Sequence, residues 1–302
     1  MQVLAIGEIL WDVFPDREIL GGAALNFCVN TARLGDSAAL ITAVGNDVRG
    51  RAARDAMHAL GLTTDFVQLA SDLPTGVAHV STTPEGEPRF DIPRPAAFDR
   101  VTVLTEMLRS AERLRPDWLY FGTLLQTEPG VERATHQLAQ SLPEVCCFYD
   151  MNLRPGNWDL SLIERLCHLA SVLKLNDSEA RTIAELTGLP NSLEAFCQKW
   201  TERFNLEALC VTLGPAGCSI YTDGSMQTVS GYPVSVHDTV GAGDAFAAAF
   251  LHGYHRDWPV EKIARCANAL GSIVASRPGA TPPWTIEEWK AKAASLPSQA
   301  TS

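Results

Sequence analysis

Short apolar segments alternate with amphipathic segments along most of this 302-residue chain. The sequences QVLAIGE, AALITAVG, DWLYFGT, CCFYDMN, SVLKLN and ALCVTLG predict strands that are buried on both faces. NFCVNTARLG and VRGRAARDAMHALG have helical spacing, and the first is predicted to end at Gly35. This alternation predicts an α/β fold with a mainly parallel central sheet that helices cover on both faces. In such folds ligands bind at the carboxyl ends of the strands.

One region departs from the alternation. The sequence from Thr75 to Ile92 contains two strand-like runs around PEGEP, which is a turn signal, so it predicts a hairpin outside the main sheet. The segment VFPDREIL, after Asp12, is a candidate partner for this hairpin. We therefore expect a small β-sheet from about residues 12–20 and 74–98, which is either a lid over a site or an ordinary surface hairpin.

The length and the hydrophobic content of 46% suit a single domain, residues 1–302, with this small sheet as an appendage. The sequence shows no internal repeats. The Ala/Ser/Pro-rich stretch after about Trp289 is predicted to fray.

Charge and cysteine usage exclude several classes of protein. The formal net charge of −11 argues against a broad nucleic-acid-binding face but leaves room for a small anionic ligand in a local site. None of the eight cysteines forms a CxxC pair, which predicts small buried side chains in a reducing cytosol. The seven histidines show no zinc spacing.

The N-terminal stretch MQVLAIGEILWDVF has no basic region before its apolar run, so it predicts a strand rather than a signal peptide. No stretch reaches about 18 apolar residues, the length of a membrane span. We therefore expect a cytoplasmic protein with no membrane partner.

The sequence HDTVGAGDAFAAAF combines small residues with an acid. The backbone amides of Gly241, Ala242 and Gly243 could converge on an anion, and a helix that starts there would add its dipole. Asp244 cannot itself hold a phosphate, but it could take the proton of a hydroxyl that attacks one. Alternatively, Asp244 only stabilises the helix N-terminus, and the small residues permit close packing.

Four further stretches carry polar residues at strand ends or helix starts. They are GEILWD with Asp12, GGAALN with Gly21, Gly22 and Asn26, KLNDSEA with Asn176 and Glu179, and VTLGPAGC with Thr212, Gly214 and Gly217. Taken alone, each is more typical of a turn or a cap, and Asn176 with Glu179 forms a capping box.

DTVGAGDAF resembles the C-terminal signature of the ribokinase-like (PfkB) carbohydrate kinases, and GGAALNFCVNTARLG is similar to their N-terminal signature. The resemblance extends from Gly7 to about Pro282. It implies a ribokinase-like fold in which the small sheet is a lid over the sugar, and it implies a sugar kinase that uses ATP. In some relatives the lids of two subunits pair, so a homodimer through the lid is a further expectation.

The resemblance also implies the role of each candidate residue. Asp244 would be the catalytic base, beside an anion hole formed by Gly241, Ala242 and Gly243. The sugar would contact Asp12, Gly21, Gly22, Asn26 and Arg154, the last of which lies in DMNLRPGNW. From the residues alone, Arg154 could equally form a structural ion pair.

On the nucleotide side, the resemblance implies roles for Asn176, Thr212, Gly214, Gly217 and Asn268. Glu179 would face Mg²⁺ through the water shell of the metal, which is compatible with its capping role. Asp238 would help to hold K⁺.

GEILWDVFPD, GGAALN and DMNLRPGNW are most similar to bacterial fructokinases, although Ala24 stands where a Pro is often found. Arg89 and Arg94 could instead meet the carboxylate of a sugar acid such as 2-keto-3-deoxygluconate. Fructose is therefore the first expectation, ahead of other ketoses, sugar acids and nucleosides.

Two rival interpretations stay open at this stage. A catalytically silent sugar or nucleotide sensor could use the same fold, although Asp244, Asn176 and Glu179 are intact. A nicotinamide-dependent dehydrogenase is the other, but no GxGxxG follows the first predicted strand.

Overall fold

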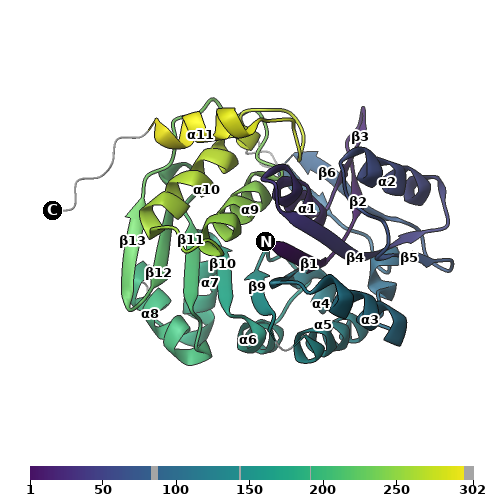
Figure 1. The fold of residues 1–302 in the computed structure, drawn as a ribbon, viewed down its shortest axis with the longest axis horizontal. Helices are drawn as coiled ribbons and strands as arrows, with labels where there is room; N and C mark the ends of the chain where they lie inside the picture. The colour runs from purple at the N-terminus through teal and green to yellow at the C-terminus, as the bar shows by residue number, and fades with distance from the viewer. Residues whose placement is uncertain (83–87, 143, 191, 296–302) are drawn as a thin grey trace.

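The central sheet dominates the computed structural model, which describes residues 1–82, 88–142, 144–190 and 192–295 (Figure 1). The described residues form a nine-stranded sheet in the order β13 (Ser225–Val229), β12 (Cys218–Thr222), β11 (Ala208–Thr212), β10 (Val172–Asn176), β9 (Cys146–Asp150), β8 (Trp118–Gly122), β1 (Gln2–Ile6), β4 (Ser37–Gly45) and β5 (Val67–Ala70). Neighbours from β11 to β5 pair in parallel, and β12 and β13 add antiparallel strands at one edge. The predicted mainly parallel sheet is confirmed.

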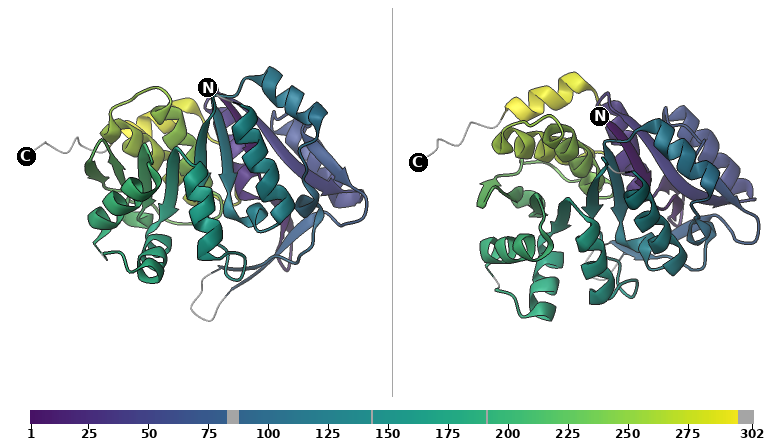
Figure 2. Two further views of the ribbon diagram at one scale, coloured as in Figure 1. Left: turned by 90° about the horizontal axis from the view of Figure 1, so that it is seen from below. Right: turned by 60° about the horizontal axis from the view of Figure 1, so that its bottom comes forward.

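Helices pack on both faces of this sheet (Figure 2). One face is covered by α1 (Ala23–Arg33), α2 (Val48–Ala59), α9 (Ala242–Tyr254), α10 (Val260–Ala275) and α11 (Ile286–Ala294). The other face is covered by η1 (Ala97–Arg100), α3 (Thr105–Leu114), α4 (Thr123–Gln126), α5 (Pro129–Ser141), α6 (Leu160–Leu169), α7 (Asp177–Thr187) and α8 (Leu193–Phe204). Strand β1 shows why two cores form, because Val3 and Ala5 face one and Leu4 and Ile6 face the other. No helix among the described residues is long and apolar enough to cross a membrane.

A second, four-stranded sheet lies beside the main body. Its order is β3 (Glu18–Gly21), β2 (Leu10–Val13), β6 (Gly76–Thr82) and β7 (Pro88–Asp91). The β2–β3 and β6–β7 pairs are antiparallel, and β2 and β6 pair in parallel. The expected small sheet is therefore present and begins at Leu10, while most of the predicted PEGEP turn lies outside the described residues. Pairing of this lid sheet between two subunits stays a prediction.

The position of Asp12 differs from the prediction that it ends the first strand. Strand β1 ends at Ile6, and Asp12 lies in the middle of β2, in the lid sheet. The chain leaves the main sheet at Gly7, where a Cβ would lie only 2.2 Å from the Cβ of Ala24. Close packing against α1 at this glycine therefore separates two strands that the sequence presents as one apolar run.

The prediction that the chain frays after about Trp289 is wrong for residues 290–294. Helix α11 continues to Ala294, and the Trp289 indole is buried and donates a hydrogen bond to the carbonyl of Cys266 at 2.8 Å. A large apolar ring with a satisfied N–H anchors this helix, although its neighbours are small. Residues 296–302 lie outside the described part of the chain.

Asp47 fixes the point at which β6 leaves the main body. Its carboxylate caps α2 by accepting from the N–H of Gly50 at 2.7 Å. It also accepts from the N–H of Thr75 at 2.8 Å and from the Thr75 hydroxyl at 2.7 Å. The lid strand that begins at Gly76 is thereby held at its base.

Asp36 joins the loop after α1 to the far end of α9. Its side chain is fully buried and accepts from His252 Nδ1 at 2.6 Å, from Arg256 Nη2 at 2.7 Å and from the Met1 amino group at 3.1 Å. Burial by itself would raise the pKa of Asp36, but the hydrogen bonds from His252, Arg256 and the amino group hold this pKa well below the ordinary value of 3.8.

We predict that Asp36→Asn lowers the free energy of unfolding by about 2 to 3 kcal/mol at pH 7, because Arg256 loses the charge that balances it. A lowered pKa stabilises the fold above the ordinary value, so the difference from the wild type should narrow only below about pH 4. Urea unfolding at pH 7 and at steps below pH 4 measures this. Asp16→Asn, in an exposed pair with Arg17, is the control and should change stability by less than about 0.5 kcal/mol. Equal effects of the two variants would contradict the prediction.

Candidate functional site

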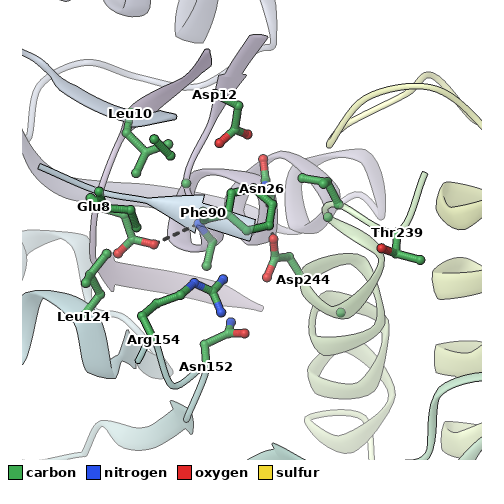
Figure 3. Close-up of a pocket in the computed structure, with 17 residues that line it drawn as sticks. Glu8, Leu10, Asp12, Asn26, Phe90, Leu124, Asn152, Arg154, Thr239 and Asp244 are labelled. Atoms are coloured by element: carbon green, nitrogen blue, oxygen red, sulfur yellow. Dashed lines mark hydrogen bonds between the residues drawn. The ribbon is translucent and has the colours of Figure 1, made fainter. Parts of the chain in front are cut away.

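A cavity of about 190 Å³ lies between the lid sheet and the carboxyl ends of the central strands (Figure 3). Its walls come from β2, β7, α1, α4, the loops after β1 and β9, and the start of α9. Seven of the sequence-predicted site residues line it, namely Asp12, Gly22, Asn26, Arg154, Gly241, Gly243 and Asp244. Residues up to 232 positions apart in the sequence therefore meet in the place where the fold predicts a ligand.

Asp244 lies in the first turn of α9 and is 7% exposed. One of its carboxylate oxygens accepts a hydrogen bond from Asn26 Nδ2 at 2.9 Å, which ties α9 to α1. Burial, and then the charge of Asp150, raise the pKa of Asp244 to about 6, against the opposing effects of Asn26, Lys174 and Arg154. A carboxylate with a pKa near neutrality, buried in a cavity, is suited to proton transfer.

The start of α9 lies at the cavity wall, where Gly241 and Gly243 line the cavity. Gly241 has φ 78°, and a Cβ there would lie 2.0 Å from the carbonyl oxygen of Ala280, so this turn requires glycine. The Ala242 N–H donates to the carbonyl of Thr239 at 3.2 Å. Of the three predicted anion-hole residues, Gly241 and Gly243 therefore line the cavity, whereas Ala242 closes the turn.

Asp12 is 4% exposed and faces the cavity from the lid side. A Cβ on Gly21 would lie 2.6 Å from Asp12 Oδ2, so Gly21 makes room for this carboxylate instead of lining the cavity. Burial raises the pKa of Asp12 to about 7, and the charges of Asp244, Asp238 and Glu8 act in the same direction against Arg154.

Glu8 is a cavity residue that the sequence analysis missed. It is buried, and its Oε1 accepts from the N–H of Ala23 at 2.9 Å, at the start of α1. Gly22 precedes that N–H with φ 115°, and a Cβ there would lie 2.4 Å from the Glu8 carbonyl oxygen. Burial raises the pKa of Glu8. A carboxylate inside the apolar run QVLAIGEIL is the signal that could have identified it.

Two buried polar atoms in the cavity have no hydrogen-bond partner among the described residues. They are Asn26 Oδ1, an acceptor, and Asn152 Nδ2, a donor. Buried polar groups are normally satisfied, so a ligand or water with hydroxyl groups fits here. Apolar side chains, including Phe90 and Leu124, also line the cavity (Figure 3).

Arg154 lines this first cavity and also an adjacent one. Its Nη1 donates to the carbonyl of Leu153 at 3.4 Å, and no ion pair of Arg154 is formed with the described residues. The structural ion pair considered for it is therefore not found in the described part of the chain. Its guanidinium points toward the space between Glu8, Asp12 and Asp244 (Figure 3).

Asn176 and Glu179 line the adjacent cavity. The predicted capping box is confirmed, since Asn176 Oδ1 accepts from the N–H of Glu179 at 2.9 Å and Glu179 Oε2 accepts from the N–H of Asn176 at 2.8 Å. Glu179 Oε1 accepts from the N–H of Leu153 at 2.7 Å, and burial raises the pKa of Glu179. Both carboxylate oxygens of Glu179 already accept a backbone N–H, and each keeps one further lone pair. Those lone pairs can accept hydrogen bonds from water, so the site fits a hydrated Mg²⁺ better than a directly bound one.

The other nucleotide-side candidates line neither of these cavities. Thr212 is the register partner of Asn176 across β10 and β11, so the two lie side by side. Gly214 and Gly217 flank the turn of η2 (Gly214–Ala216) between antiparallel β11 and β12, and both have positive φ. The segment from Thr212 to Gly217 therefore closes a β-hairpin, and this hairpin lies next to Asn176 at the start of α7.

The side chains of Asn268 and Asp238 form hydrogen bonds with backbone groups of neighbouring loops. The buried Asn268 amide donates to the carbonyls of Val229 and Ser230, both at 3.2 Å. Asp238 accepts from the N–H of Val240 at 3.0 Å and from the N–H of Gly279 at 3.3 Å. The carboxylate of Asp238 thus joins its own loop to the loop that contains Gly279. Its oxygens are ligands of the kind that a hard cation such as K⁺ prefers.

Lys174 and Asp150 form a buried ion pair at 2.8 Å that the sequence analysis also missed. Tyr120 donates its hydroxyl to the other oxygen of Asp150 at 3.2 Å. Burial alone would lower the pKa of Lys174, but the charge and the hydrogen bond of Asp150 raise it. A lysine within the apolar strand SVLKLN was the available signal, because a buried charge needs a partner.

Arg94 is not placed to meet a ligand. It forms an ion pair with Asp99 and also donates to the Leu124 carbonyl at 3.0 Å and to the Thr127 hydroxyl. The expectation that it could bind a sugar acid is not supported, because Arg94 does not line the cavity and these partners use four of its five guanidinium N–H groups. The side chain of Arg89 lies outside the described part of the chain.

Known protein families and proteins include relatives of this chain. A family model described as "pfkB family carbohydrate kinase" matches residues 13–287. The chain is 30% identical over 309 residues to a probable fructokinase-7 of Arabidopsis thaliana, covering 93% of this chain and 88% of that one. It is 28% identical over 301 residues to an aminoimidazole riboside kinase of Salmonella typhimurium, covering 92% and 90%.

A crystal structure of a fructokinase with bound ATP from Xylella fastidiosa has the same fold, with a TM-score of 0.85 at 23% identity, covering 96% of this chain and 97% of that one. The expected ribokinase-like fold with its separate small sheet is confirmed. Because the family model matches most of the chain, this protein belongs to the pfkB family of carbohydrate kinases.

Proposed function

We propose that this protein is an ATP-dependent kinase of a small neutral sugar, with fructose as its most favoured substrate. The observation that carries the proposal is the buried Asp244 carboxylate at the N-terminus of α9, inside a cavity with unsatisfied polar atoms. A base beside a helix N-terminus is what transfer of a phosphoryl group to a hydroxyl requires.

In the proposed reaction, Asp244 accepts the proton of a primary hydroxyl while that oxygen attacks the γ-phosphorus of ATP in line. A bond forms between the sugar oxygen and the γ-phosphorus, and the bond from the γ-phosphorus to the β,γ-bridging oxygen breaks, which releases ADP. The amides of Gly241 and Gly243 stabilise the charge on the transferred group. Mg²⁺, when bound, neutralises charge on the phosphates.

Asp12 and Asn26 orient the sugar. Asp12 accepts hydrogen bonds from sugar hydroxyls, and the free Asn26 Oδ1 accepts another. Asn152 Nδ2 donates to a sugar oxygen from the other side. The lid sheet excludes water from the cavity, so that ATP is not hydrolysed in place of transfer.

The nucleotide phosphates contact Asn176, Thr212, Gly214 and Gly217 in this proposal. Glu179 holds the water shell of Mg²⁺, Asp238 helps to hold K⁺, and Asn268 supports the nucleotide site through the backbone after β13. Asn176 and Thr212 are register partners at the ends of their strands, which supports one shared site.

Charge in the cavity favours a neutral sugar over a sugar acid. The carboxylates of Glu8, Asp12 and Asp244 face it, against the one guanidinium of Arg154. A substrate carboxylate would add to this negative charge, and Arg94 is already paired with Asp99. A nucleoside is the second candidate, because Phe90 and Leu124 offer an apolar wall to a base.

A substrate panel tests the acceptor. With MgATP and purified protein, fructose should give the highest kcat/KM in an ADP-coupled assay, above other ketoses, aldoses and nucleosides. 2-Keto-3-deoxygluconate should react slowly, for the electrostatic reason given above. Preference for the sugar acid would contradict the substrate proposal, and ligand binding without any phosphorylation would favour the sensor interpretation.

Asp244→Asn should lower kcat by at least about 100-fold, because the amide keeps the shape but cannot accept the proton. The sugar KM should change much less, since Asn26 and Asp12 stay in place. Asp72→Asn, in an exposed ion pair with Arg100, is a control that should retain wild-type kinetics. If Asp244→Asn retained near wild-type kcat on the best sugar, the proposed mechanism would be wrong.

The pH dependence follows from the two raised pKa values. Because both carboxylates act in their ionised form, kcat/KM should fall as pH drops below about 7, where Asp12 protonates, and more steeply below about 6, where Asp244 protonates. In Asp12→Asn the upper step of the kcat/KM profile should disappear, so that kcat/KM falls in a single step near pH 6, where Asp244 protonates. A wild-type profile that stayed flat from about pH 5 to 8 would contradict these assignments.

A further inference from the structure

The ion pair of Lys174 and Asp150 lies beside the start of α9, although neither residue lines the cavity. Lys174 belongs to β10 and is 4% exposed, and Asp150 ends β9 and is 0% exposed. Lys174 Nζ lies 3.6 Å from the position that a Cβ would take on Gly243. The ammonium group therefore packs against the residue that immediately precedes Asp244.

The pair is held in place from behind. Asp150 accepts from Lys174 at one oxygen and from the Tyr120 hydroxyl at the other, at 2.8 and 3.2 Å. Replacing a buried ion pair by apolar groups is often neutral or stabilising, so stability alone is a weak reason to keep one in a core. Its place next to the catalytic turn suggests a different role.

Asp244 experiences charged and titratable groups from every element packed around it. They are Glu8, Asp12, Tyr120, Asp150, Arg154 and Lys174, with Asn26 as its hydrogen-bond partner. Only Lys174 and Arg154 carry positive charge in this set. Arg154 lies on a loop at the cavity wall, whereas Lys174 is fixed inside a strand, so its charge is held in one position.

We propose that Lys174, fixed by Asp150, is a positioning residue that supports the Gly243–Asp244 turn and keeps Asp244 ionised for proton transfer. The inference rests on the proposed function, because it concerns the base of that reaction. The two members of the pair act on Asp244 with opposite sign, since the Lys174 charge favours the ionised form and the Asp150 charge opposes it.

The test is the pH profile of kcat/KM for the best sugar in four proteins, which are wild type, Lys174→Met, Asp150→Asn and the double variant. Lys174→Met should move the lower step of the acid side, the one assigned to Asp244, to higher pH by about one unit, because an attractive charge is lost. The limb compared among the variants is this Asp244 step. Activity should recover at alkaline pH, which loss of structure would not allow. Asp150→Asn should move the limb to lower pH, and the double variant should lie between the single variants.

Lys174→Met leaves a buried carboxylate unpaired and could prevent folding. The double variant removes both charges and so leaves neither of them unpaired in the core. Comparing it with Asp150→Asn removes the Lys174 side chain without leaving a buried carboxylate unpaired. The limb should lie at higher pH in the double variant than in Asp150→Asn. Lys174→Arg keeps the charge and should retain a limb close to that of the wild type.

The inference would be overturned if the kcat/KM of Asp150→Asn and that of the double variant fell at the same pH. It would also be overturned if Lys174→Met lost kcat equally at every pH. Failure of the proposed function would look different. In that case the folded wild type would phosphorylate no sugar, or Asp244→Asn would remain active. An active wild type, an inactive Asp244→Asn variant and coincident limbs would reject only the role of Lys174.

Discussion

The burial of helix α9 is the constraint on which the site depends. Its sequence, AGDAFAAAFLHGY, is apolar around most of its circumference, so the helix must be enclosed, and it packs closely between α1 and α10. Enclosing the helix also encloses Asp244 in its first turn, while Asp36 fixes its far end through His252. A carboxylate that burial has deprived of solvent has a raised pKa, and Gly241 and Gly243, just before it, line the same cavity.

The electrostatics of the cavity follow from this enclosure. Three carboxylates line a small cavity, and two of them are held by a backbone or amide donor, namely Glu8 by Ala23 N–H and Asp244 by Asn26 Nδ2. These hydrogen bonds limit the cost of burying like charges but do not remove it. Burial, and secondarily the repulsion between these like charges, raises the pKa values of Asp12 and Asp244 toward neutrality, where a change of protonation is useful to chemistry.

The sequence predicts the parts of the site that depend on local pattern. Hydrophobic alternation predicted the central strands, and the glycines around Asp244 predicted the turn that lines the cavity, because both signals lie in consecutive residues. It could not predict that Asp12 leaves the main sheet, since that depends on the contact of Gly7 with Ala24 in another element. Lys174 and Glu8 were missed because their partners are remote in the sequence or on a neighbouring strand. The pairing of Arg94 with the nearby Asp99 was missed because it depends on how the chain turns between the two residues.

The hydrogen bond between Asn26 and Asp244 joins two parts of the chain with separate tasks. Most residues that would face the sugar come from the first half, on β2, β7, α1 and α4, whereas the turn that would carry out the chemistry comes from the second half. Under the proposed function, substitutions in the lid strands would change the shape of the acceptor pocket without altering the turn that carries Asp244. Such a division would let a lineage of these proteins diversify its substrates by drift in one half while selection preserves the reaction in the other.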